Sequence, residues 1–362
     1  ASELVGIYLG EGARKVMVVF SVVLLVLVGV VFVTGPAGLL NTLTSVNTQV
    51  WVVVIFAYYI LATVLPVDKV IGKIYPIFGA ALILMAIGIA GGLIFKGYHI
   101  PELTLQNYYP DGAKSIFPYL FITIACGAIS GFHATQSPLM ARCVEHEREI
   151  RPVFYGSMVA EGIIALIWAA AAMAFYHGEP QLQAVFGATP AVGVNQMSVT
   201  LLGHVGAALA VLGVVACPIT SGDTAFRSAR LTIADSFNIK QEKLSSRFMI
   251  AIPLFAVGIA LTFIDFQIIW RYFSWANQTL AMIMLWTGSM FLLKNNKNYM
   301  ITVAPAIFMT AVTFSYIMQA DEGFKLSGTV GNIIGVVAAV LFAVAFFIKA
   351  NKVKKAGHNK AA

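Results

Sequence analysis

The sequence predicts an all-α protein that crosses a membrane about ten times. Hydrophobic residues make up 59% of the 362 residues and charged residues only 11%, whereas a soluble domain carries about 25% charged residues. The mean hydropathy is +0.85. Apolar runs of about 17–25 residues, the length that spans a bilayer as a helix, recur along the whole chain. These observations predict a polytopic membrane protein in contact with lipid rather than a soluble domain.

Ten apolar runs have about the length of a membrane-spanning helix. In chain order they are Val16–Val33, Val50–Leu65, Ile74–Phe95, Ile116–Phe132, Phe154–Tyr176, Thr200–Thr220, Phe248–Trp270, Phe273–Leu293, Met300–Gln319 and Val330–Ile348. Short segments join them, and no linker separates a second domain. We therefore expect residues 1–362 to form a single membrane domain, with a basic, solvated tail at residues 349–362.

The distribution of basic residues predicts which side of the membrane each loop occupies. If the N-terminus is cytoplasmic and the runs alternate in direction, 19 of the 23 Lys and Arg residues lie on the cytoplasmic side. Cytoplasmic loops of membrane proteins carry such an excess, so both termini are expected in the cytoplasm. The basic residues lie in short loops and the tail rather than on one face of a soluble domain, so no nucleic-acid partner is expected.

The fourth run predicts a discontinuous helix. Pro138 lacks a backbone donor, and the residue before a proline is biased out of the helical region. Lipid cannot satisfy freed backbone groups, so such a break lines a polar cavity or packs on protein, and secondary transporters bind their ligands at breaks of this kind. The spacing of Gly127 and Gly131 is also that of a helix-packing motif. The substrate-binding candidates are Gly127, Ser130, Gly131, His133, Thr135, Gln136 and Ser137.

A second interrupted run, residues 216–233, offers oxygen ligands for a cation. Pro218 again interrupts the helical hydrogen bonding, and hydroxyl and carboxylate groups surround Gly222. The alternative is that Asp223 pairs with Arg227, four residues further along the helix. Apart from Na⁺ at Thr220 and Ser221, no metal is expected. The coupling-ion candidates on this run are Thr220, Ser221, Asp223 and Thr224.

Other polar residues inside the runs have a structural and a functional interpretation. Glu161 lies about 10 Å into the fifth run, where it is a candidate proton carrier or ion partner or a protonated acid bonded to a neighbouring helix. His133 could titrate or bond a freed carbonyl. Asn277 and Gln278 could join helices or line a pore. No nucleotide-binding fingerprint appears, and the three cysteines have no metal spacing, so no cofactor is expected. A membrane-embedded enzyme would need two or more acids, histidines or cysteines at one depth, and only Glu161 and His133 come close, so no enzyme is expected.

At these residues the chain resembles the carbon starvation protein A (CstA) family of bacterial inner-membrane proteins. The resemblance is carried by Glu3–Lys15, Phe121–Cys143, Pro218–Phe237 and Tyr272–Ala281. It implies a fold similar to the amino acid–polyamine–organocation transporters, with a LeuT-like inverted repeat. Family members extend beyond the point that matches Ala1, so the resemblance implies a chain that lacks N-terminal helices, with Ile116–Phe132 and Thr200–Thr220 as the sixth and eighth core helices.

The family's members look like peptide or pyruvate uptake systems that act when carbon is short. The resemblance therefore implies a secondary transporter in the inner membrane that imports a small carboxylate-bearing nutrient by symport with H⁺ or Na⁺. Some members have a Lys after the proline of the sixth helix, whereas Leu139 follows Pro138 here, which leaves the substrate open. The alternative is a membrane sensor or structural protein without transport activity. The oligomeric state is left open.

Overall fold

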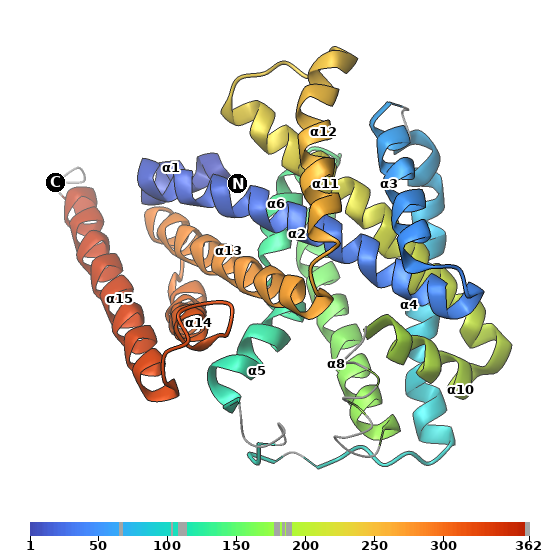
Figure 1. Cartoon of the computed structure of the whole chain (residues 1–362). Coiled ribbons are helices and arrows are strands. Elements are labelled where there is room, and N and C mark those ends of the chain that lie inside the picture. The colour runs from blue at the N-terminus through green and yellow to red at the C-terminus, as the bar shows by residue number, and fades with distance from the viewer. Residues whose placement is uncertain are drawn as a thin grey trace. The chain divides into compact units, whose positions relative to one another are not determined.

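The computed structural model describes residues 1–64, 68–102, 104–107, 114–176, 182, 185 and 190–358, which contain helices and no strand (Figure 1). This confirms the predicted all-α class. Two π-helical turns lie at Arg151–Gly156 and Val211–Ala216, and a 3₁₀ turn lies at Ala125–Gly127. The α-helices are α1 (Ser2–Leu9), α2 (Glu11–Thr44), α3 (Thr48–Val64), α4 (Asp68–Phe95), α5 (Ile116–Ile124), α6 (Gly131–Ala141), α7 (Glu147–Ile150), α8 (Ser157–Phe175), α10 (Pro190–Ala210), α11 (Cys217–Ser236), α12 (Leu244–Leu261), α13 (Phe266–Lys294), α14 (Met300–Gln319) and α15 (Gly328–His358).

Seven helical stretches of the described residues are long and apolar enough to cross a membrane. Three predicted runs are not among them, for different reasons. The second run is the short apolar helix α3, the fourth is divided between α5 and α6, and the eighth lies in α13, which carries polar side chains. A polytopic membrane protein is thus confirmed, and the count of ten stays a prediction.

The predicted boundary between the seventh and eighth runs was wrong by several residues. The apolar run continues to Trp270 in the sequence, but α12 ends at Leu261 and α13 begins at Phe266. Asp265 explains the early start of α13, because its Oδ1 accepts a hydrogen bond from the backbone N–H of Gln267 at 2.9 Å. An aspartate in this position caps a helix N-terminus.

The chain forms two compact units, and α2 contributes to both. Unit 1 comprises residues 1–24, 111–150 and 271–362, and unit 2 comprises residues 25–110 and 151–270. The prediction of a single membrane domain is not tested by this division.

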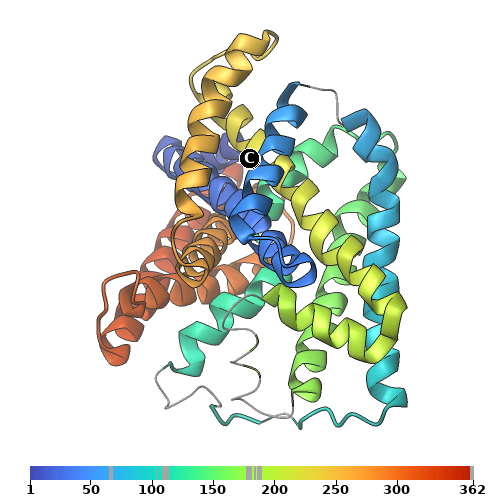
Figure 2. The same cartoon turned by 45° about the vertical axis from the view of Figure 1, so that its right-hand side comes forward.

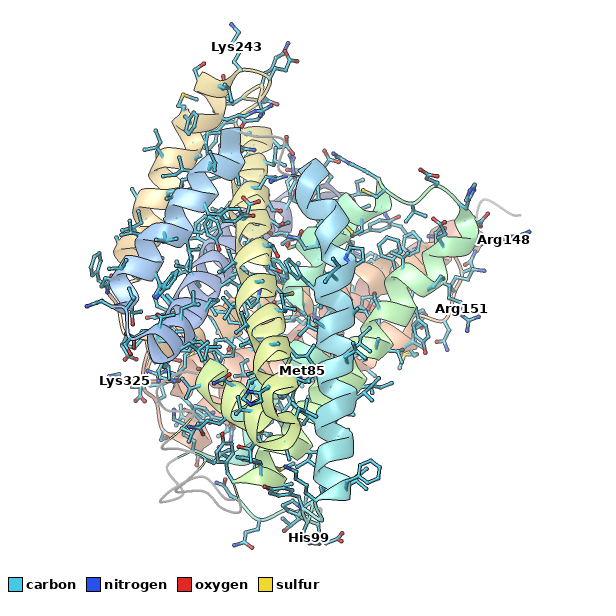
Figure 3. The ribbon with its side chains drawn as sticks, turned by 90° about the vertical axis from the view of Figure 1, so that its right-hand side faces the viewer. Met85, His99, Arg148, Arg151, Lys243 and Lys325 are labelled. Atoms are coloured by element: carbon cyan, nitrogen blue, oxygen red, sulfur yellow. The ribbon has the colours of Figure 1, made fainter. Side chains whose placement is uncertain are left out.

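In unit 2, α4 packs against α8, α10 and the π turn that precedes α11. Figure 3 shows Met85 of α4 among these helices. Small residues let the helices approach closely, since a Cβ atom on Gly213 would lie 3.0 Å from the Met85 side chain. The buried residues of this core are Met85, Ile89, Leu93, Ala171, Ala174, Tyr176, Met197, Leu201 and Ala210.

Helix α10 turns a sharp corner before it leads into α11 (Figures 1 and 2). Gly203 makes the corner with φ 62° and ψ −141°, a conformation that a residue with a side chain rarely adopts. The two arms then approach so closely that a Cβ atom on Gly206 would overlap the carbonyl group of Ser198. The corner lies in the first part of the sixth predicted run.

In unit 1, α14 and α15 form a tightly packed hairpin, and α5 and α13 pack against α14. Phe121 of α5 contacts Phe308 edge to face, with ring centroids 5.0 Å apart. Trp286 of α13 donates a hydrogen bond to the hydroxyl of Thr310 at 3.0 Å. Helices α5 and α13 therefore both pack on α14, and α5 leads into the predicted break.

Candidate functional site

The predicted helix break lies between α5 and α6. Helix α5 ends at Ile124, a 3₁₀ turn follows, and Ser130 is extended with φ −108° and ψ 128° before α6 begins at Gly131. The break therefore falls at the predicted glycines. Pro138 does not contribute to it, contrary to our expectation, because it lies inside α6. The hydroxyl of Ser137 bonds the carbonyl of His133, four residues earlier in α6, at 2.6 Å.

Two amide side chains of α13 bind the two sides of the break. The Oδ1 atom of Asn277 accepts hydrogen bonds from the backbone N–H of Phe132, at 2.8 Å, and from the hydroxyl of Ser130, at 3.1 Å. The Nε2 atom of Gln278 donates to the carbonyl of Ile122 at 3.4 Å. Both amides are fully buried. Asn277 thus satisfies an N–H at the start of α6, and Gln278 binds a carbonyl at the end of α5, which are the groups that a broken helix leaves without partners.

Gly131 lets α6 approach the backbone of α13. A Cβ atom at this position would lie 2.2 Å from the carbonyl oxygen of Asn277 and 2.5 Å from Cβ of Leu280. Real Cβ atoms do not approach a backbone atom so closely. Of the two interpretations of Gly131, helix packing is therefore the one with direct geometric support.

The remaining substrate-binding candidates follow one another on α6 and are half-buried. The hydroxyl of Thr135 donates to the carbonyl of Phe132 at 2.7 Å, and the amide of Gln136 donates to the hydroxyl of Thr135 at 3.1 Å. The hydroxyl of Thr135 therefore both donates and accepts a hydrogen bond within α6. With Gly127 in the 3₁₀ turn and Ser130 in the break, all seven candidates lie along one short segment of unit 1.

The second predicted interruption, at Pro218, is a change from π-helical to α-helical hydrogen bonding, and the helix continues through it. The π turn Val211–Ala216 leads directly into α11, and Pro218 lies in the first turn of that helix. Pro218 has no N–H to donate, and it directly follows the π turn, where the regular α-helical hydrogen bonding is already interrupted. The hydroxyls of Thr220 and Thr224 bond the carbonyls of Cys217 and Thr220, at 2.9 and 3.2 Å.

Asp223 is buried in an ion pair with Arg227, the arrangement that the sequence left as an alternative. Nη2 of Arg227 lies 3.0 Å from Oδ2 of Asp223, and the aspartate side chain is 9% exposed. Arg230 is also buried, and the three charged residues line one cavity of about 10 Å³, together with Thr63 of α3. Such a volume holds about one water molecule. Asp223 therefore balances arginine charge in this conformation.

We predict that Asp223→Asn destabilises the protein more than the loss of an exposed ion pair does. Removing one partner of a buried pair leaves an uncompensated charge and costs about 3 kcal/mol or more. Thermal unfolding of the purified protein measures this loss, and Asp223→Asn combined with Arg227→Gln should recover part of it. The matched control is Glu11→Gln, which removes the exposed Glu11–Arg14 pair and should cost less than about 1 kcal/mol. Equal losses from both single variants would refute the interpretation.

Glu161 lies on α8, apart from the other coupling-ion candidates in the chain. It is half-buried. Helix α8 packs against α4 and α10, whereas α11, which carries Thr220, Ser221, Asp223 and Thr224, packs against α3, α4 and α12. Helix α4 is a neighbour of both. All five coupling-ion candidates belong to unit 2, and all seven substrate-binding candidates belong to unit 1.

Sequence reasoning missed Arg230 and did not decide the role of the two amides. Arg230 is seven residues after Asp223, so both lie on the same face of a helix; this spacing is the signal that could have found it. Asn277 and Gln278 were found as buried amides. Their partners lie more than 140 positions earlier in the chain, where no local pattern points.

The family profile of carbon starvation protein CstA matches residues 3–197. The chain belongs to the carbon starvation protein CstA family. The matched range is more than half of the chain and includes the helix break at residues 125–130. This confirms the family that the sequence motifs indicated, whereas a LeuT-like fold and missing N-terminal helices stay predictions.

Curated relatives of the chain include named transporters. The chain is 36% identical to the peptide transporter CstA of Campylobacter jejuni over 121 residues, 32% of this chain and 17% of that protein. It is 35% identical to the pyruvate/proton symporter BtsT of Escherichia coli over 113 residues, 29% of this chain and 15% of that protein. Both names describe transporters rather than enzymes, as the sequence analysis expects.

An uncharacterized membrane protein of Haemophilus influenzae is 40% identical over 233 residues, which are 50% of this chain and 63% of that protein. The matches therefore span less than two thirds of this relative, and less than a fifth of each named transporter. The comparison with solved structures gave no match. Together, the family and the apolar helices support a multi-span membrane protein of the CstA family, consistent with a bacterial inner membrane.

Proposed function

We propose that the chain is part of an inner-membrane secondary transporter that imports a small carboxylate-bearing nutrient, a short peptide or pyruvate, when carbon is scarce. Import is coupled to a proton or sodium gradient, and the fold is LeuT-like with both termini in the cytoplasm. The two named relatives support this choice of substrates. The observation that carries the proposal is the break between α5 and α6, held at both sides by buried amides of α13.

The break supports substrate binding because it gathers polar side chains and backbone groups in one short segment of unit 1. Gly127, Ser130, Gly131, His133, Thr135, Gln136 and Ser137 form the proposed binding segment. In α6 the N-terminus faces the break, and a helix N-terminus favours a negatively charged group. A substrate carboxylate fits this polarity, since secondary transporters direct the N-termini of discontinuous helices at such groups.

The coupling ion is proposed to bind on α11. Thr220 and Ser221 are the preferred ligands, because hydroxyl oxygens suit hard cations such as Na⁺ and neither residue has to give up an ion pair. Asp223 would have to exchange Arg227 for the ion, and Thr224 lies one turn after Thr220. For a proton-coupled mechanism, Glu161 or His133 would carry the proton.

The proposal is tested by uptake into membrane vesicles that contain the complete protein. Labelled pyruvate and labelled di- and tripeptides are each offered with an imposed proton gradient, with a sodium gradient and with neither. Uptake that requires one gradient identifies both the ion and the substrate class. Folded protein that takes up none of these compounds under either gradient would refute the proposal and favour the alternative, a sensor or structural protein.

We predict that Ser221→Ala lowers gradient-driven uptake about tenfold, because the loss of one oxygen ligand costs about 1.5 kcal/mol. The same vesicle assay measures it. The matched control is Ser157→Ala, which removes an exposed helical hydroxyl that bonds only its own helix, at the carbonyl of Val153, and should leave uptake unchanged. If Ser221→Ala transports at the rate of the unaltered protein, the ion does not bind at this hydroxyl.

A further inference from the structure

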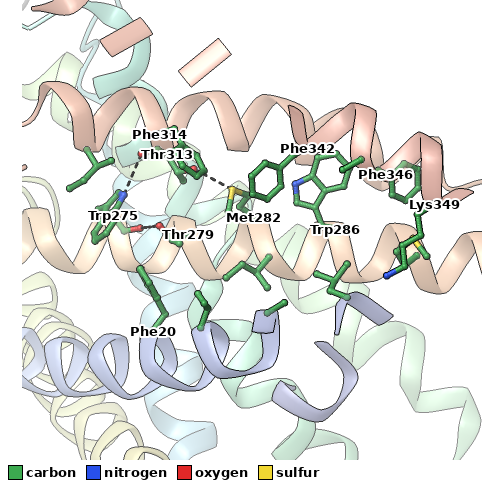
Figure 4. Close-up of a pocket in the computed structure, with 17 residues that line it drawn as sticks. Phe20, Trp275, Thr279, Met282, Trp286, Thr313, Phe314, Phe342, Phe346 and Lys349 are labelled. Carbon is green, nitrogen blue, oxygen red and sulfur yellow. Dashed lines mark hydrogen bonds between the residues drawn. The ribbon is translucent and has the colours of Figure 1, made fainter. Parts of the chain in front are cut away.

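Unit 1 contains an apolar cavity that the proposed transport function does not use. It has a volume of about 570 Å³, within the range of about 300–1,000 Å³ that is usual for ligand pockets. The first part of α2 and the helices α13, α14 and α15 surround it, as Figure 4 shows. Aromatic side chains dominate the wall: Phe20, Trp275, Trp286, Phe314, Phe342 and Phe346.

The polar groups along the wall already have partners within the protein. The indole N–H of Trp275 donates to the carbonyl of Thr313 at 3.3 Å, and that of Trp286 donates to the hydroxyl of Thr310 at 3.0 Å. The hydroxyls of Thr279 and Thr313 donate to backbone carbonyls of their own helices, at 2.9 and 2.8 Å. Away from Lys349, the wall of the cavity is therefore apolar, which favours a hydrocarbon ligand.

One end of the cavity is positively charged. Lys349 lies there, at the end away from Trp275 (Figure 4). Its ammonium donates to the carbonyl of Tyr8 at 3.1 Å, which uses one of its three donors. The ammonium of Lys294 lies 4.8 Å from the centre of the Tyr8 ring, so two cations flank the same tyrosine. Both lysines are exposed, and Lys349 itself lines the cavity.

The cavity is open along its side. Val16 and Phe342 belong to its wall, yet they are 47% and 41% exposed. Both lie in helices with apolar stretches long enough to cross a membrane, so we expect the lipid of the bilayer to reach these side chains. An acyl chain can therefore enter from the side without passing through water.

We propose that this cavity binds an anionic phospholipid, with an acyl chain between α2, α13, α14 and α15 and the phosphate at Lys349 and Lys294. The carbon wall matches the acyl chain, and the two lysines match the headgroup in charge. The predicted topology places this end at the cytoplasmic leaflet, where anionic lipids attract basic residues next to a membrane helix. The proposal is independent of the substrate and of the coupling ion.

Native mass spectrometry of the complete protein, purified in detergent and titrated with phosphatidylglycerol or phosphatidylcholine, tests the proposal. We expect one phosphatidylglycerol molecule to bind in preference to phosphatidylcholine. Replacing Lys349 by Ala should weaken its binding about fivefold, and replacing Lys294 as well should weaken it about 25-fold, because each lysine near the headgroup contributes about the same attraction. Lys349→Arg should retain binding. Obstructing the cavity with Ala345→Trp should weaken binding of the lipid.

The matched control is Lys352→Ala, which removes an exposed lysine one turn further along α15 that is not part of the wall. It should bind phosphatidylglycerol as the unaltered protein does. Equal binding of both lipids, or unchanged binding by the double lysine variant, would overturn the proposal. A lipid-free dimer that Ala345→Trp dissociates would also overturn it, since a second copy would then occupy the cavity.

Discussion

Gly131→Ala is expected to abolish uptake and to lower the stability of the protein by about 3 kcal/mol or more, a large value for overpacking. The added methyl group would lie 2.2 Å from the backbone carbonyl of Asn277 and 2.5 Å from Cβ of Leu280. A flexible side chain could move aside, but here a helix backbone has to move. That shift also lengthens the hydrogen bonds that Phe132 and Ser130 donate to Asn277. The variant therefore loses both the close packing of α6 on α13 and the hydrogen bonds at the start of α6.

Thermal unfolding of the purified protein and substrate uptake in vesicles measure the two effects of Gly131→Ala. The matched control is Gly288→Ala on α13, where the new Cβ would make an ordinary contact of 3.8 Å with Thr302. Alanine favours a helix over glycine by up to about 1 kcal/mol, so the control should be neutral or slightly stabilising. Should both variants unfold at the same temperature and transport equally well, the close approach of α6 and α13 would have no role.

Asn277→Ala is the second variant with a large expected effect. It removes the acceptor of the Phe132 N–H and of the Ser130 hydroxyl in a fully buried position. A buried donor left without a partner costs about 1–3 kcal/mol, and the truncation also leaves a cavity. We expect a lower unfolding temperature and a higher KM for the transported substrate, because Ser130 and the first turn of α6 lose their fixed position.

The control for Asn277→Ala is Asn295→Ala. Asn295 follows α13, is exposed, and its amide also bonds a backbone carbonyl, that of Phe291 at 2.8 Å. Its replacement should change neither the KM nor the unfolding temperature measurably. An unchanged KM in Asn277→Ala would mean that the break keeps its geometry without this amide.

The all-α, membrane-spanning class could be predicted from the sequence because the length of an apolar run is a local property, whereas the orientation that loop charge indicates stays a prediction. The break at Gly127–Gly131 was found in the same way, since several glycines and polar residues follow an apolar run. Pro138 misled the prediction because it lies inside α6 without ending the helix, and membrane helices tolerate internal prolines. The end of the seventh run was missed because Asp265, a helix cap, looks like any other interfacial acid.

The hydrogen bonds from Asn277 and Gln278 to the two sides of the break could not be predicted, for a physical reason. Whether a buried amide joins helices or lines a pore depends on which helix lies opposite it, and the sequence of α13 alone does not contain that information. The same holds for Asp223. Its spacing to Arg227 allowed an ion pair, but the burial of Asp223, with the buried Arg230 beside it, makes the pair a costly one to break.

Helix α13 has one further consequence for how the proposed site can move. Because consecutive residues of this helix, Asn277 and Gln278, bind the two sides of the break, α5 and α6 share a single rigid support. A tilt of either half relative to the other requires a buried hydrogen bond to open. A conformational change that keeps these bonds has to carry α5, α6 and α13 together, so the binding segment would change its access by moving as one body.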